Sequence, residues 1–197
     1  MAIIKSCPIP PPSVFDEIPP LSIGSPEDPL PFRNLDEFER WLCGDYISRI
    51  TYSQDYSKVE CIGIFSSNQM LETCCLQYAI NEVEYPKEFQ KLLRRKIISH
   101  NHFSDEGFSK EDVYTWADLQ LQEIRVIMPF KVVAFRTYSI KRLDPEHPTW
   151  DEIETIIKVQ DPSLNNFKFN PNYRHKCLLF LKEKGLIEYS VDPPIPD

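Results

Sequence analysis

The residues of this chain that are best suited to chemistry are His100, His102 and Asp112. The two histidines lie two positions apart and directly follow an apolar pair, Ile97-Ile98. In a strand, residues i and i+2 lie on the same face, so both imidazoles could reach one metal ion from one side of a sheet edge. Asp112, at the predicted start of a helix, would add a third ligand and leave one position open for water. That is the layout of a catalytic zinc site rather than of a structural one.

The metal at such a site lowers the pKa of its bound water from 15.7 towards about 7. Hydrolysis also needs a group that is not a ligand and that takes up the proton of this water and returns it. Glu60 is the preferred candidate, since it interrupts an otherwise apolar strand at 59–65 and a carboxylate is costly to bury unpaired. Ser109, one helical turn before Asp112, could present its hydroxyl to the oxyanion formed when water attacks a carbonyl. The rival glutamates are Glu72, Glu82 and Glu84.

Each of these features also has a purely structural interpretation. Ser109 followed by Asp112 is a good helix start, with a serine N-cap and an acid three residues later. The two histidines could be a solvated pair, and Glu60 could face solvent on a half-exposed strand. The combination favours a site, because the residues occur in the order and at the spacing that a site requires.

Alternation and turn residues predict an α/β domain that would hold these residues. After a helix at 35–42 that Gly44 ends, strands are expected at 47–52, 58–65, 70–78, 97–99, 124–128 and 131–138. A helix from Pro86 to Arg94 and one capped by Ser109 flank the histidines. Past residue 144, helices are expected at 149–158 and 172–184, with a polar stretch at 161–171 between them and Gly185 at the end.

This pattern divides the chain into three parts. Residues 1–33 form a proline-rich arm, 34–143 the main domain, and 144–197 a helical extension that is too small for its own core and is expected to pack on the main domain.

Composition limits the expected cellular location and the expected classes of binding partner. The net charge of −8 argues against binding to nucleic acid or to an anionic membrane, since both depend on a surplus of lysine and arginine. Neither a signal peptide nor an apolar run long enough to span a bilayer is visible. The six cysteines contain no CxxC pair, which indicates reduced thiols rather than a disulfide framework. These features predict a cytoplasmic protein with no membrane partner.

The same residues resemble the JAB/MPN-type (JAMM) zinc metalloproteases, whose pattern is a glutamate on an early strand, then His-x-His-Pro, then Ser-x-x-Asp opening a helix. Here Glu60, His100-Asn101-His102 and Ser109 to Asp112 match this pattern within residues 45–140. The asparagine between the histidines resembles the prokaryotic RadC-like and phage-associated branches. The chain departs from the pattern at Phe103, where proline is expected, and in having one residue fewer than usual between His102 and Asp112.

The resemblance implies a curved, mixed β-sheet flanked by helices, of the cytidine-deaminase-like kind, and one bound Zn²⁺. It assigns the metal to His100, His102 and Asp112, the acid–base role to Glu60 and oxyanion stabilisation to Ser109. The reaction it implies is hydrolysis of a peptide or isopeptide bond at the C-terminus of a ubiquitin-like protein or its conjugate, with proteins of a modification system as partners. Two alternatives stay open: a non-catalytic MPN-like binding or scaffold module, and a RadC-like protein linked to DNA processing.

Overall fold

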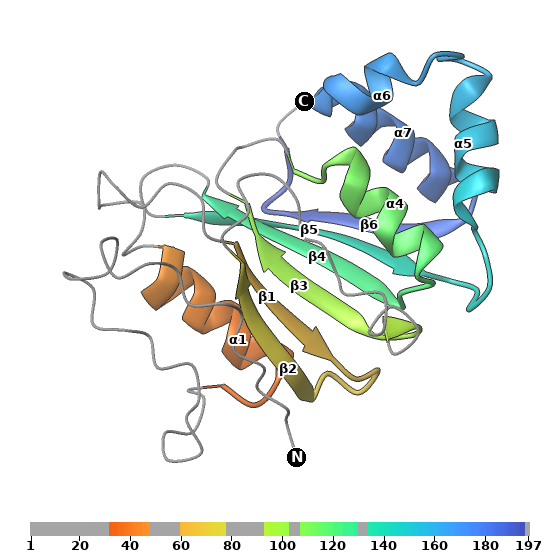
Figure 1. Cartoon of the computed structure of the whole chain (residues 1–197). Helices are drawn as coiled ribbons and strands as arrows, with labels where there is room; N and C mark the ends of the chain where they lie inside the picture. Colours follow the sequence, from red (N-terminus) through yellow and green to blue (C-terminus); the bar gives the residue numbers. More distant parts are fainter. Residues whose placement is uncertain (1–31, 48–59, 78–92, 103–106, 130–133, 196–197) are drawn as a thin grey trace.

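The computed structural model of the protein describes residues 32–47, 60–77, 93–102, 107–129 and 134–195 (Figure 1). Several sequence-based expectations lie outside these residues: nearly all of the proline-rich arm, all but the first residue of the strand expected at 47–52, most of the helix that begins at Pro86, and Phe103.

A six-stranded mixed sheet forms the centre of the molecule, with its strands in the order β2-β1-β3-β4-β5-β6. Strands β3 and β4 run parallel, whereas every other neighbouring pair is antiparallel. The predicted α/β class with a mixed sheet is therefore confirmed. The strands are β1 (Glu60–Phe65), β2 (Leu71–Gln77), β3 (Ile97–Asn101), β4 (Glu123–Pro129), β5 (Phe135–Arg142) and β6 (Ile187–Asp192).

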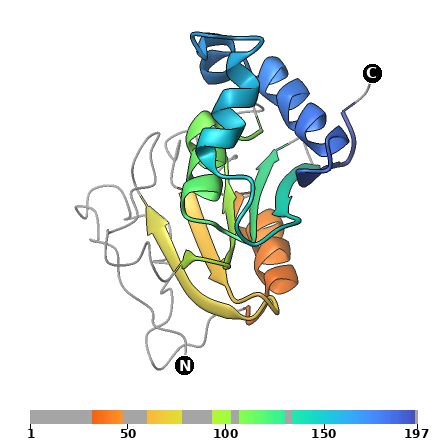
Figure 2. The ribbon, with the colours of Figure 1, turned by 90° about the vertical axis from the view of Figure 1, so that its right-hand side faces the viewer.

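Helices cover both faces of this sheet, as the turned view shows (Figure 2). One face carries α1 (Leu35–Trp41), which continues as a π-helical segment, η2 (Leu42–Ile47). The other face carries α4 and, beyond it, α5 to α7. These helices are α4 (Lys110–Asp118), α5 (Trp150–Lys158), α6 (Asn165–Phe169) and α7 (Pro171–Glu183). Each face buries its own apolar cluster, so the sheet separates two cores.

Alternation along β3 decides which groups meet which helices. Ile97 belongs to the core under α1, and Ser99, on the same face, donates from Oγ to Glu39 of that helix at 2.9 Å. Ile98 belongs to the core under α4. His100 is therefore on the α4 side of the sheet, because residues two apart in a strand share a face.

Several element boundaries differ from the expectations. Gly44 does not end the first helix, since η2 runs on to Ile47. A glycine weakens a helix by only about 1 kcal/mol, and buried Leu42 holds this segment against the core. Strand β5 begins and ends later than predicted, and the polar stretch after Asp161 contains α6.

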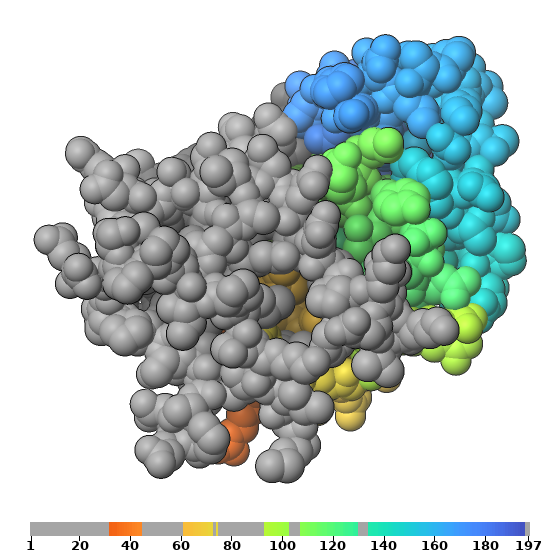
Figure 3. All heavy atoms as spheres, in the orientation of Figure 1, coloured from red at the N-terminus to blue at the C-terminus, as the bar shows by residue number. Residues whose placement is uncertain are grey.

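The segment after residue 144 is part of the main structure and also supplies a strand. Strand β6, which the sequence analysis missed, pairs antiparallel with β5 along its length. Ile153, Phe167 and Leu178 lie in the same buried cluster as Ile62 of β1. In the space-filling view, the surface of α4 continues into that of the C-terminal helices (Figure 3).

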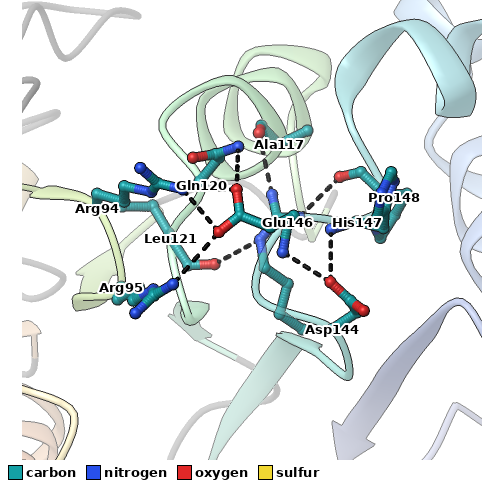
Figure 4. Close-up of polar contacts among 10 residues, drawn as sticks. Arg94, Arg95, Ala117, Gln120, Leu121, Asp144, Glu146, His147 and Pro148 are labelled. Atoms are coloured by element: carbon teal, nitrogen blue, oxygen red, sulfur yellow. Dashed lines mark hydrogen bonds and ion pairs between the residues drawn. The ribbon is translucent and has the colours of Figure 1, made fainter.

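Polar contacts fix the turn that leads into this segment (Figure 4). The carbonyls of Ala117, Leu121 and Pro148 point to one place, where the buried Arg142 guanidinium donates to all three. Beside it, Glu146 accepts from Arg94, the residue that leads into β3, at 2.7 Å. The end of α4 and the start of the C-terminal segment are thus tied together. None of the helices in the described part of the chain is long and apolar enough to cross a membrane.

Candidate metal centre

Strand β3 and helix α4 bring the predicted ligands together. His100 lies inside β3, where it pairs with Ile62 of β1 and Val126 of β4, and it is only 3% exposed. The His102 backbone N–H donates to the Ile127 carbonyl at 2.9 Å, so the histidine just past the end of the strand is also fixed. Asp112 lies in the first turn of α4, next to both rings.

The three side chains converge on one point. The Nε2 atoms of His100 and His102 are 3.1 Å apart. Asp112 Oδ1 is 3.1 Å from Nε2 of His100, and Oδ2 is 3.4 Å from Nε2 of His102. Bonds of 2.0–2.2 Å to a tetrahedral metal imply edges of about 3.3–3.6 Å between neighbouring ligand atoms. The three separations lie within this range or a few tenths of an ångström below it. Within the described ranges, His100, His102 and Asp112 thus form a group that could hold a metal ion.

A backbone carbonyl sets the orientation of the second histidine. Nδ1 of His102 lies 2.8 Å from the Gly107 carbonyl oxygen. A carbonyl can only accept, so Nδ1 carries the proton and Nε2 presents its lone pair to the point of convergence. Nδ1 of His100 is buried and has no hydrogen-bond partner in the part of the chain that the structure describes. Within the described residues, the His100 ring therefore makes its polar contacts through Nε2, which faces His102 and Asp112.

The helix cap orients the aspartate. Asp112 Oδ2 accepts from both the backbone N–H and the hydroxyl of Ser109, each at 2.7 Å. The Ser109 oxygen in turn accepts from the Asp112 N–H at 3.0 Å. The capping box and the ligand arrangement therefore coexist in one residue pair, with Oδ2 used by the cap and Oδ1 directed at His100.

Electrostatics keep this carboxylate ionised. Burial is the largest single effect and would raise the pKa of Asp112. Coulombic interactions with His102 and His100, with hydrogen bonds from His100 and Ser109, outweigh it and hold the pKa of Asp112 well below its ordinary value. An ionised carboxylate is the form that binds a metal.

The residues present fit a divalent metal ion. Two imidazole nitrogens and one carboxylate oxygen form a set of the kind found in catalytic zinc sites. Metal-binding histidines commonly donate their other N–H to a carbonyl, as His102 does to Gly107.

The candidate proton carriers are less closely tied to this centre. Glu60 is the first residue of β1, two positions before Ile62, the residue that pairs with His100; its side chain lies outside the described structure. Glu72 forms an ion pair with Lys96 at 2.6 Å. Glu82 and Glu84 lie outside the described residues.

Two supporting residues were missed in the sequence analysis. Gly107, with φ of +68°, supplies the carbonyl for His102, and a glycine just before a capped helix is a signal that could have suggested a special backbone position. Arg174 of α7 is buried and donates to the carbonyl of Phe108. Nothing in the local sequence distinguishes it from a surface arginine.

Comparisons of the chain with protein-family models, with curated proteins and with solved structures gave no match.

Proposed function

We propose that this chain is a zinc-dependent hydrolase of the JAMM type. It would cleave a peptide or isopeptide bond at the C-terminus of a ubiquitin-like protein or its conjugate. The observation that carries the proposal is the convergence of the two Nε2 atoms and the Asp112 carboxylate on one point. The order of the elements supports a JAB/MPN-like fold: a strand begins with Glu60, another contains His100, and a helix carries Asp112 in its first turn.

In this proposal the chain's own groups divide the work. His100, His102 and Asp112 hold the ion, and the Gly107 carbonyl keeps the His102 lone pair directed at it. A bound Zn²⁺ supplies a Lewis acid that acidifies water and polarises a carbonyl. Glu60 carries the proton between water and the leaving amine. Its support is the strand register, because positions 60 and 62 of β1 are two apart and Ile62 pairs with His100.

Ser109 contributes first by orienting Asp112. Its hydroxyl proton is donated to Asp112 Oδ2, and its oxygen accepts from the Asp112 N–H. Stabilisation of an oxyanion, the role that the resemblance gives to Ser109, requires this proton to rotate from Oδ2 towards the substrate.

Metal analysis combined with three substitutions tests the proposal. The purified protein should contain, or take up, about one zinc per chain. The variants His102→Ala and Asp112→Ala should lose the zinc. His147→Ala is the matched control, because His147 is an exposed histidine away from the site, and this variant should keep the zinc. Failure of the folded wild-type chain to bind zinc would refute the metal site.

Catalysis is tested on a ubiquitin-like protein fused through its C-terminus to a reporter. Glu60→Gln should retain the metal and lose cleavage by a factor of about 10² or more. Glu188→Gln is the matched control, since Glu188 is an exposed strand residue paired with Lys141 on the far side of the sheet. Zinc binding without cleavage of such fusions would favour the non-catalytic MPN-like module instead.

A further inference from the structure

Arg174 is a buried cation that contacts the segment just before α4, the helix that carries Asp112. It lies in α7, far from His100 and Asp112 in sequence, and is 3% exposed. Its Nε donates to the Phe108 carbonyl at 2.5 Å, while Nη1 donates to the Phe167 and Lys168 carbonyls at 2.6 Å and 3.0 Å. The guanidinium thus joins the end of α6 to the residue just before the N-cap of α4.

The Phe108 carbonyl and the Ser109 N–H are the two ends of one peptide unit. Because a peptide unit is planar and trans, a bond that fixes the direction of its carbonyl also fixes that of its N–H. The Ser109 N–H donates to Asp112 Oδ2 at 2.7 Å. A continuous path therefore runs from the Arg174 guanidinium through one rigid peptide unit to the carboxylate of the candidate metal ligand.

The bond from Arg174 also strengthens the hydrogen bond between the Ser109 N–H and Asp112 Oδ2. A donor placed on a carbonyl polarises the peptide unit, so its N–H becomes a better donor. The same segment is packed on its other side: Phe108 is buried in the core, and Tyr138 lies against Gly107. The peptide unit between residues 108 and 109 is thus held by packing and by a charged group together.

We infer that Arg174 is a positioning residue that orients Asp112 towards the metal through the peptide unit between Phe108 and Ser109. This inference rests on the proposed metal site and deepens it. It gives the C-terminal helices a role in the site, although they supply none of the three candidate ligands, His100, His102 and Asp112.

Arg142 provides a matched control for its test. It too is a buried arginine that donates to backbone carbonyls, but its acceptors include Ala117 and Leu121 at the opposite end of α4. Arg174→Met and Arg142→Met are the same substitution at two buried arginines, and each removes a guanidinium that donates to backbone carbonyls. Both variants should therefore have a lower melting temperature than the wild type. Only the first removes a contact that leads to Asp112.

The first measurement is the zinc dissociation constant at 25 °C, where both variants must be shown to be folded. Arg174→Met should raise it by about 10- to 100-fold, the usual effect of losing a group that orients a ligand. Arg142→Met should leave it within about twofold of wild type. An unchanged constant in Arg174→Met, or an equal rise in both variants, would overturn the inference.

The second measurement uses the metal-free protein and so separates this inference from the proposed function. In the cap, the Ser109 N–H donates to the Asp112 side chain and the Asp112 N–H donates to the Ser109 side chain. Hydrogen exchange at these two amides should be faster in Arg174→Met by about tenfold or more. Arg142→Met should leave both rates near wild type. If the wild type binds no zinc, the proposed function fails, while unchanged exchange in Arg174→Met would independently refute the role of Arg174.

Discussion

Among single residues, Gly107 carries two constraints that no other residue type satisfies at once. Its φ of +68° lies in the left-handed region, where a side chain costs energy. A Cβ at this position would lie 2.8 Å from the Tyr138 ring. Both constraints act on the residue whose carbonyl accepts from His102, so backbone geometry and ligand orientation are coupled here.

Gly107→Ala is therefore expected to damage the centre beyond its effect on the fold. We expect a loss of about 1–3 kcal/mol in the free energy of unfolding and a rise of about 10-fold or more in the zinc dissociation constant. Denaturant unfolding and metal titration measure the two effects.

Gly185→Ala is the control, because Gly185 also has φ of +68° but no atom lies within 4 Å of the added Cβ. It should show the backbone cost alone and bind zinc like wild type. Equal zinc affinities in the two variants would contradict the proposed orientation of His102 by Gly107.

At the scale of elements, α4 and α5 begin with the same motif but differ in what the motif serves. Ser109 and Asp112 form a capping box on α4, and Thr149 and Glu152 form one on α5. In α4 the acid of the box is also a candidate ligand, whereas Glu152 instead contacts the exposed His147. The pair allows a comparison of helix capping with and without a metal ligand.

Ser109→Ala and Thr149→Ala should each cost about 1 kcal/mol of stability through the lost cap. Ser109→Ala should in addition weaken zinc binding several-fold, because Asp112 Oδ2 loses its hydroxyl donor. Thermal unfolding and metal titration of both variants provide the test, and an unaltered zinc affinity in Ser109→Ala would show that the backbone N–H alone is enough to orient Asp112.

The local elements of the site were predictable because their signals are local. A spacing of two placed His100 and His102 near one another, and a serine followed by an acid predicted the start of α4 at its observed position. The signals that failed were those that depend on distant contacts. Strand β6 forms by pairing with β5, and Arg174 is buried because Phe108 and Phe167 accept from it.

At the scale of the whole molecule, the C-terminal helices and the sheet share one core. Phe167 of α6 is fully buried in the cluster that contains Ile62 and Val126 of the sheet. Phe169, two residues later in the same helix, is 70% exposed. The two phenylalanines therefore test whether the segment unfolds together with the sheet.

Phe167→Ala should lower the free energy of unfolding by about 3–5 kcal/mol, the usual cost of emptying a buried aromatic site. Phe169→Ala should change it by at most about 1 kcal/mol. Denaturant unfolding followed by both circular dichroism and tryptophan fluorescence should give one coincident transition in each case. Two separate transitions would show instead that the C-terminal segment is an independent unit.

The path from Arg174 to Asp112 also has a consequence for the order of events during synthesis. The three candidate ligands have all left the ribosome once Asp112 has emerged, but the guanidinium that orders the cap arrives only with α7. In the proposed site, the ligands are therefore synthesised before the residue that orients Asp112. Because the C-terminal helices share one core with the sheet, full affinity for zinc should be reached only after α7 has docked, and a chain terminated before residue 174 should bind zinc more weakly than the full chain or not at all.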